Sequence, residues 1–182
     1  MKIPVLILLA SAIIYSGSDL RAQNGTSKMP VDPDTKLITN KEVVTTTGTP
    51  AELYNRAIAW VNKQYKNPAD ATKVRDPSSG VIEIIHRFEI TQKVQGVTLM
   101  AEVVDYSLKL ELKEGRYRYI ITNFNAKDVS RQPVERWLNK NDQSYIPAWD
   151  DYLKQVDDLT HKLIESLKLG MQPPAAKKPD TW

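Results

Sequence analysis

Apolar and charged positions alternate through the middle of the chain and predict two long strands. In residues 81–91 the even positions are apolar or aromatic except His86, and the odd positions include Glu83, Arg87 and Glu89. A second strand is predicted over 97–113, where residues 104–112 alternate in the same way. Because successive side chains of a strand point to opposite faces, each segment has one core face and one solvent face.

The register of the first hairpin follows from the same alternation. An uninterrupted ladder closed by a two-residue turn at 95–96 would set Ile82 opposite Lys109, a core position beside a solvent position, so that register is rejected. A three-residue loop would instead place His86 opposite Val104 or Tyr106. A bulge in one strand would have the same effect. Both solutions remain open.

In the second hairpin the parity is reversed. The apolar positions of residues 117–121 are odd, so a two-residue turn at 114–115 brings the core faces of the two strands into line. Glu111 then lies opposite Arg118 on the solvent face. Such a cross-strand pair of opposite charges contributes about 0.2–1 kcal/mol.

A first helix is predicted over residues 49–66 by its start signals. Thr49 is a favourable N-cap, Pro50 occupies the first helical position, and Glu52 completes a capping box. Apolar side chains recur at three- and four-residue steps along this segment, as they do in an amphipathic helix.

A second, longer helix is predicted over residues 145–169, with one apolar stripe and Gly170 as its C-terminal cap. His161 follows Asp157 by four residues, an ordinary surface pair on a helix. Between the sheet and this helix, residues 128–141 are charged with apolar side chains at helical spacing, which predicts a short helix across a crossover.

The order of these elements predicts an α+β fold. Residues 37–46 and a weaker segment at 70–75 add two strands, which gives the order β-α-β-β-β-β-α. Each helix has one apolar stripe and the sheet has one apolar face. We therefore expect a curved antiparallel sheet of about five strands with both main helices packed on one face. The opposite face is left open to solvent.

The first 22 residues have the layout of a secretory signal peptide. A short basic start, an apolar run over 3–15 and a small residue at Ala22 precede a polar stretch. An uncleaved anchor or a buried helix is the alternative, although the run is shorter than the ~20 residues of a membrane-spanning helix. We expect export, to the periplasm or outside the cell, and no transmembrane anchor after cleavage. Residues 23–36 would then be a flexible lead-in, 37–169 a single domain, and 170–182 a disordered tail.

Composition narrows the possible functions. The formal net charge of +3 falls to +2 without Lys2, Arg21 and Asp19, which argues against nucleic acid as a partner. The chain has no cysteine, so it has no disulfide, zinc–thiolate site or cysteine nucleophile, and no lipid-modified cysteine. No glycine-rich phosphate loop or metal-ligand spacing occurs. We expect neither a cofactor nor a metal.

His86 and Glu102 are the one pair that could support catalysis. Both lie on the core face of neighbouring strands, with Glu102 near Phe88 or Ile90 in the allowed registers. A histidine beside a carboxylate can act as an acid–base pair. The favoured interpretation is structural, with a partly buried histidine and a local bulge that turns Glu102 outward.

The open face offers a candidate binding surface. Most of its positions are charged, and a few are apolar. Single exposed apolar residues are normal on a protein surface, whereas a contiguous group of them would indicate a binding site. A register that sets Ile85 opposite Asp105, and Asp105 opposite Phe124, would place both apolar side chains in one row beside an acid. The candidate binding residues are Ile85, Val103, Asp105, Arg116, Arg118, Ile120 and Phe124.

Three stretches resemble a known family. They are Leu37-Ile38-Thr39-Asn40-Lys41-Glu42-Val43-Val44, then Leu53-Tyr54-Asn55-Arg56-Ala57 followed by Trp60, and Gly80-Val81-Ile82-Glu83. They look like a domain of unknown function found in exported proteins of Bacteroides-type bacteria, with a fold like the TATA-box-binding protein (TBP). The resemblance covers about residues 37–169. It implies that fold and export, and it implies no activity and no catalytic residues.

These observations favour an exported, non-catalytic binding module that uses its open sheet face. Its partner would be an unknown envelope protein or a small apolar ligand. An envelope hydrolase or lyase using His86 and Glu102 is the alternative. A purely structural role in an envelope assembly is indistinguishable from the first interpretation at this level.

Overall fold

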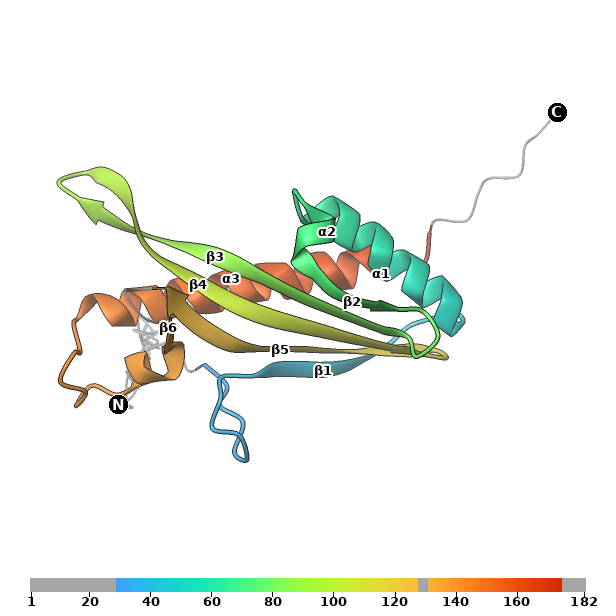
Figure 1. The fold of residues 1–182 in the computed structure, drawn as a ribbon, viewed down its shortest axis with the longest axis horizontal. Helices are drawn as coiled ribbons and strands as arrows, with labels where there is room; N and C mark the ends of the chain where they lie inside the picture. Colours follow the sequence, from blue (N-terminus) through green and yellow to red (C-terminus); the bar gives the residue numbers. More distant parts are fainter. Residues whose placement is uncertain (1–28, 128–130, 175–182) are drawn as a thin grey trace, which may run out of the picture.

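The computed structural model describes residues 29–127 and 131–174, which form an α+β fold with one antiparallel sheet (Figure 1). The expected signal peptide at 1–22 lies outside the described residues, as does the end of the tail from residue 175. The strands are β1 (Asn40–Thr45), β2 (Thr72–Asp76), β3 (Val81–Val94), β4 (Val97–Lys113), β5 (Arg116–Lys127) and β6 (Arg131–Pro133). Their order across the sheet is β1-β5-β4-β3-β2, and β6 pairs with β5.

Two helices, α1 (Pro50–Gln64) and α3 (Ala148–Gly170), pack against one face of this sheet (Figure 1). The core positions are the even residues of β3 and β4 and the odd residues of the first half of β5, as the alternation predicts. Tyr106, Leu108 and Leu110 of the central strand are almost completely buried under the helices. The other face stays open. No described helix combines the length and apolarity needed to cross a bilayer.

The start of α1 is held as its sequence predicts. The Thr49 hydroxyl accepts a hydrogen bond from the Glu52 backbone N–H at 3.3 Å, and the Glu52 carboxylate accepts one from the Thr49 N–H at 2.8 Å. This reciprocal pair satisfies two backbone donors that the first helical turn leaves free. The helix ends at Gln64, and Pro68 begins a further single turn, α2 (Pro68–Ala71).

The first hairpin uses the bulge rather than the three-residue loop. His86 lies opposite Tyr106, and the pairing shifts by one residue between Ile90 and Thr91. The extra residue is in β4, so a two-residue turn at 95–96 still closes the hairpin. Both turn residues have positive φ, as a tight hairpin turn requires.

The second hairpin has the predicted two-residue turn, and Glu111 lies opposite Arg118. Further along, the pairing shifts between Ser107 and Asp105. The extra residue is in β5, where Asn123 takes a left-handed φ of 58°. A bulge of this kind reverses which side chains of the strand face the core from that point onward.

The crossover contains a short helix, as predicted for residues 128–141, and this helix is of the 3-10 type and follows a short strand. Its described part is the three-residue strand β6 followed by a 3-10 helix, η1 (Val134–Leu138). Proline at the start of η1 leaves no side-chain cap there. Trp137 is buried and packs its ring against Trp149 and Tyr152 of α3, so the crossover covers the start of the long helix.

Residues 29–36, within the segment expected to be a flexible lead-in, contact the domain. Met29 is 4% exposed and belongs to the hydrophobic core. Val31 forms a single antiparallel bridge with Ile38, and the Asp32 carboxylate pairs with the Lys41 ammonium at 2.7 Å. This segment therefore extends the edge formed by β1. On α3, the Asp157–His161 pair is present at 3.2 Å.

Gly170 does not form the C-terminal cap that the sequence predicts for it. It is the last residue of α3 and does not have the left-handed φ of a helix-ending glycine. A Cβ at this position would lie 2.6 Å from the Trp60 ring and 2.9 Å from the Trp60 Cβ. The missing side chain thus lets the end of α3 approach α1 closely.

We expect Gly170→Ala to destabilise the fold, although alanine is the better helix former by about 1 kcal/mol. Overpacking a filled site costs about 1–3 kcal/mol, so the free energy of unfolding should fall on balance. Urea denaturation measures it. The neighbouring exposed residue gives the control, since Leu169→Ala should change stability by less than about 0.5 kcal/mol. An unchanged or more stable Gly170→Ala variant would contradict the close approach.

Candidate functional site

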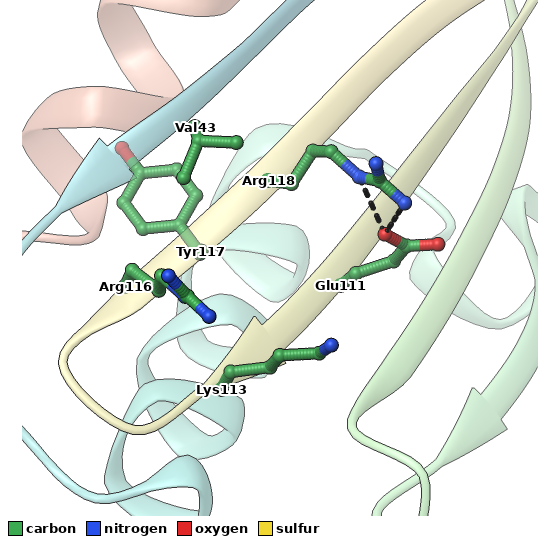
Figure 2. A pocket seen from close by; sticks show the side chains of 6 residues that line it. All are labelled: Val43, Glu111, Lys113, Arg116, Tyr117 and Arg118. Carbon is green, nitrogen blue, oxygen red and sulfur yellow. Dashed lines mark hydrogen bonds and ion pairs between the residues drawn. The ribbon is translucent and has the colours of Figure 1, made fainter.

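The open face has a pocket of about 190 Å³ at one end, where the turn between β4 and β5 meets β1 (Figure 2). Its walls are Val43, Glu111, Lys113, Arg116, Tyr117 and Arg118. We call this region the basic end, because three of these six side chains are cationic and one is acidic. Val43 is 57% exposed, so an apolar side chain stands in water beside the cations.

One ion pair organises the basic end. The Arg118 guanidinium donates through Nε to the Glu111 carboxylate at 2.6 Å and contacts the same oxygen through a second nitrogen (Figure 2). The two residues face each other across the β4–β5 ladder. The Lys109 ammonium approaches Glu111 as well, at 3.6 Å. Glu111 is therefore already engaged and does not neutralise the remaining cations.

Lys113 and Arg116 are those remaining cations. They are direct partners in the ladder, at the last pair before the turn. Neither forms an ion pair with any described residue within 4.0 Å, and Figure 2 shows both reaching over the same side of the hairpin. Like charges placed directly opposite each other destabilise a strand pair. The basic end thus presents two uncompensated positive charges to solvent.

Beneath the basic end, Tyr117 has its hydroxyl buried without a hydrogen-bond partner among the described residues. Burial raises the pKa of Tyr117 to about 12, and the nearby Glu42 carboxylate acts in the same direction. Glu42 accepts hydrogen bonds from the Lys168 ammonium and the Tyr119 hydroxyl, both at 2.7 Å. These bonds lower the pKa of Glu42, the one to Lys168 most strongly. This cluster ties β1 to α3.

The middle of the face holds four of the residues expected to bind. Ile85 lies opposite Ser107 and is 45% exposed, so the register that placed it opposite Asp105 is wrong. The bulge near Ile90 explains the difference, because it allows a two-residue turn with the other even register. Asp105 lies opposite Arg87, and its carboxylate is 3.9 Å from the Lys127 ammonium.

The two other apolar candidates are partly covered. Ile120 lies opposite Lys41 on one side and Lys109 on the other. Val103 lies opposite Glu89 towards the far end of β4. Ile120 and Val103 therefore lie beside charged side chains, whereas Ile85 lies beside Ser107 and lines one pocket together with Ile120. Val103 does not line that pocket, so the three apolar side chains do not form a single row.

Phe124 is not on the open face, and its assignment to the binding surface is a correction. It is completely buried and lies against Tyr106, with ring centroids 6.4 Å apart. The bulge at Asn123 turns it to the helix side and leaves Asn125, rather than Phe124, opposite Asp105. Uninterrupted alternation cannot reveal such a reversal.

We expect Phe124→Ala to lower the free energy of unfolding by about 3–5 kcal/mol, as for other large core side chains. Ile85→Ala, an open-face change of similar kind, should cost less than about 1 kcal/mol. Chemical denaturation of both variants compares the two positions directly. A mild effect of Phe124→Ala would place this side chain outside the core.

The structure does not bring His86 and Glu102 together. His86 Nδ1 lies 3.2 Å from the Arg87 carbonyl oxygen, and its ring packs on Tyr65 with centroids 4.8 Å apart. Glu102 lies opposite Ile90, four residues from His86 along β3, a separation of ~13 Å at the usual strand rise. The Glu102 carboxylate accepts the Val103 N–H at 2.9 Å. No acid–base pair forms between them.

Among the described residues, no group of three or more His, Asp or Glu side chains is placed to hold a metal ion. The pattern of the sequence predicts only part of the basic end. It identifies Arg116 and Arg118 as candidate binding residues, but not Lys113 or Val43. The signal was available, because a two-residue turn at 114–115 necessarily sets Lys113 opposite Arg116. The place of Val43 in this site follows only from the pairing of β1 with β5, two strands that lie far apart along the chain.

Burial lowers the pKa of His86 below its ordinary value of 6.5, although the hydrogen bond to the Arg87 carbonyl opposes the shift. Between the lowered pKa and 6.5 the unfolded chain therefore binds more protons than the folded chain. We expect the free energy of unfolding to decrease as the pH falls through this window. The loss should be smaller in His86→Gln when denaturation at about pH 7.5 and about pH 5 is compared.

Ile85→Gln is the matched control, because it introduces the same side chain at the neighbouring exposed position of β3 and removes no titratable group. It should retain the pH dependence of the unmodified protein. A His86→Gln variant with the full pH dependence would show that His86 is not the group that titrates.

Comparison with known proteins gives the family and the fold. Residues 40–127 match the model of a domain of unknown function, DUF4468, with a TBP-like fold. A DUF4468 family protein from Bacteroides ovatus ATCC 8483 is similar in structure, with a TM-score of 0.61 and 13% identity over 78% of this chain and 90% of that one. A TBP-like protein from Parabacteroides distasonis ATCC 8503 has a TM-score of 0.54 and 14% identity over 77% and 97%. No curated protein matches.

Proposed function

Since residues 40–127 are a DUF4468 domain, which has a TBP-like fold and no assigned function, we propose a function from the site itself. The protein is an exported, non-catalytic binding module, and its open face engages an acidic segment of another envelope protein at the basic end. The fold name alone gives no activity, because one fold supports many functions. Export is supported by the layout of residues 1–22.

The observation that carries this proposal is the uncompensated pair Lys113 and Arg116. Direct opposition of like charges lowers the stability of the free protein, by up to about 1 kcal/mol for a cross-strand pair. A carboxylate placed between the two cations would replace repulsion by attraction. Charge-assisted hydrogen bonds of this kind are the stronger ones in protein recognition.

At the basic end, the geometry supports a protein segment over a small apolar ligand. The pocket of about 190 Å³ is smaller than the roughly 300–1,000 Å³ of typical small-molecule sites. Its cations would be poorly solvated under an apolar ligand, which would provide no counter-charge. An acidic segment can neutralise them and lay an apolar side chain on Val43, which stands exposed beside them.

The test uses Lys113→Glu, which converts the repulsive pair into an attractive one. We expect the free protein to gain about 0.2–1 kcal/mol of stability. At the same time it should bind a poly-glutamate peptide about tenfold more weakly or worse, because a charged hydrogen bond is worth about 1.5–3 kcal/mol. Thermal denaturation and isothermal titration calorimetry measure the two effects.

The matched control is Lys162→Glu, the same charge change on an exposed position of α3. It should leave peptide binding unchanged. In the native host, a photo-crosslinking residue at position 43 should give a product that disappears in the Lys113→Glu background and persists in the control. Binding of inorganic phosphate without binding of the peptide, or equal loss in both variants, would contradict an acidic protein partner at this site.

A further inference from the structure

Strand β3 has a free edge over half its length. β2 pairs with it only from Val81 to Ile84, and beyond that point β3 continues without a strand on its outer side (Figure 1). Exposed strand edges offer unpaired backbone groups to other chains. This edge lies away from the basic end and involves none of its residues, so the inference below is independent of the proposed function.

Hydrogen bonds on both sides show which backbone groups of β3 point outward. The Gly80 carbonyl accepts a bond from the Leu112 N–H, so even positions point towards β4. The Thr91 N–H and carbonyl are both bonded by the side-chain amide of Gln155, at 3.0 and 2.8 Å, so odd positions point away from β4. Because the bulge is in β4, the alternation along β3 is unbroken. Arg87 and Glu89 therefore direct their backbone groups outward. The Arg87 carbonyl oxygen also lies 3.2 Å from His86 Nδ1, and its second lone pair is left for a partner.

The free stretch is bounded at both ends. β2 covers the edge up to Ile84, and Gln155 of α3 acts as a partner for Thr91, in place of a neighbouring strand. Between these bounds the side chains of Arg87 and Glu89 are exposed on the open face. Neither forms an ion pair with a described residue within 4.0 Å. Phe88, between them, is only partly buried on the helix side.

We propose that this edge pairs with the same edge of a second copy of the chain, antiparallel, about a two-fold axis at Phe88. Arg87 of each copy then lies opposite the Glu89 of the other, which gives two ion pairs on the open face. The same two residues exchange their outward N–H and carbonyl groups, because an antiparallel ladder bonds such pairs reciprocally. The two Phe88 side chains meet on the helix side.

Charge selects this register over its neighbours. An axis at residue 87 would set two arginines opposite each other, and an axis at residue 89 would set two glutamates opposite each other. An axis between residues would pair outward backbone groups with inward ones. An axis at His86 keeps the backbone parity but sets Arg87 opposite the uncharged Ile85. Only the axis at Phe88 gives both the hydrogen bonds and the ion pairs, and the interface is isologous, as in most homodimers.

The edge is short, so the dimer is weak and depends on protein concentration. Sedimentation velocity of the full chain at sub-millimolar concentration and low salt should show it. Arg87→Glu and Glu89→Arg should each be monomeric, because each variant opposes like charges twice. An equimolar mixture of these two variants should dimerise again, since one chain then carries acidic side chains at positions 87 and 89 and its partner carries basic ones at both. Lys93→Glu, on the same strand and face, should dimerise normally.

A second measurement uses the lack of cysteine in the chain. Residue 88 meets its own copy in a pair that lacks backbone hydrogen bonds, where Cα atoms are about 4.5 Å apart, within disulfide range. Mild oxidation of Phe88→Cys should give a covalent dimer, and Lys93→Cys should not. A monomeric unmodified protein, or a mixture of the two charge variants that stays monomeric, would overturn the proposal. Equal crosslinking of both cysteine variants would overturn it too.

Discussion

The two-residue period of the central strand β4 over residues 104–112 is the constraint on which the rest of the structure depends. β4 has Leu108 and its even neighbours under the helices, and every strand paired with it must present its own apolar side chains to the same side. Burial of an aliphatic side chain contributes roughly 1.5–3 kcal/mol, so a slip by one residue along this strand would expose the whole core face. The open face is the other consequence of that period, because its charged side chains occupy the alternate positions that point away from the core.

This constraint explains what could be predicted from the sequence and what could not. Element order, the capping box at Thr49, the pairing of Glu111 with Arg118 and the burial of the helix stripes all follow from local periodicity. The two bulges do not, because each inserts one residue whose position depends on packing rather than on pattern. Phe124 was therefore assigned to the wrong face, and Ile85 to the wrong partner. Gly170 likewise needed the position of Trp60, a contact between distant helices.

The candidate site shows the same division. Arg116 and Arg118 could be found because they flank a tight turn, whereas Val43 joins them through the pairing of β1 with β5. His86 and Glu102 share a face and a neighbourhood in sequence terms, but pairing along β3 separates them. Functional assignments from parity alone thus identify the face of a residue only as far as the next bulge, as Phe124 shows. The alternation of two paired strands predicts which residues lie opposite each other only where no bulge intervenes.

The bulge at Asn123 also has an evolutionary consequence. It puts the last part of β5 out of phase with the first in the numbering, and the extra residue itself accounts for the offset. A relative that lacks this residue would return to plain alternation and keep the aromatic side chain of Phe124 in the core, whereas a relative of the same length without the bulge would present it to solvent. A single-codon deletion at this point would thus be absorbed by loss of the bulge, while the central ladder and the faces of β5 stay intact. Divergence within this architecture need not proceed by substitution alone.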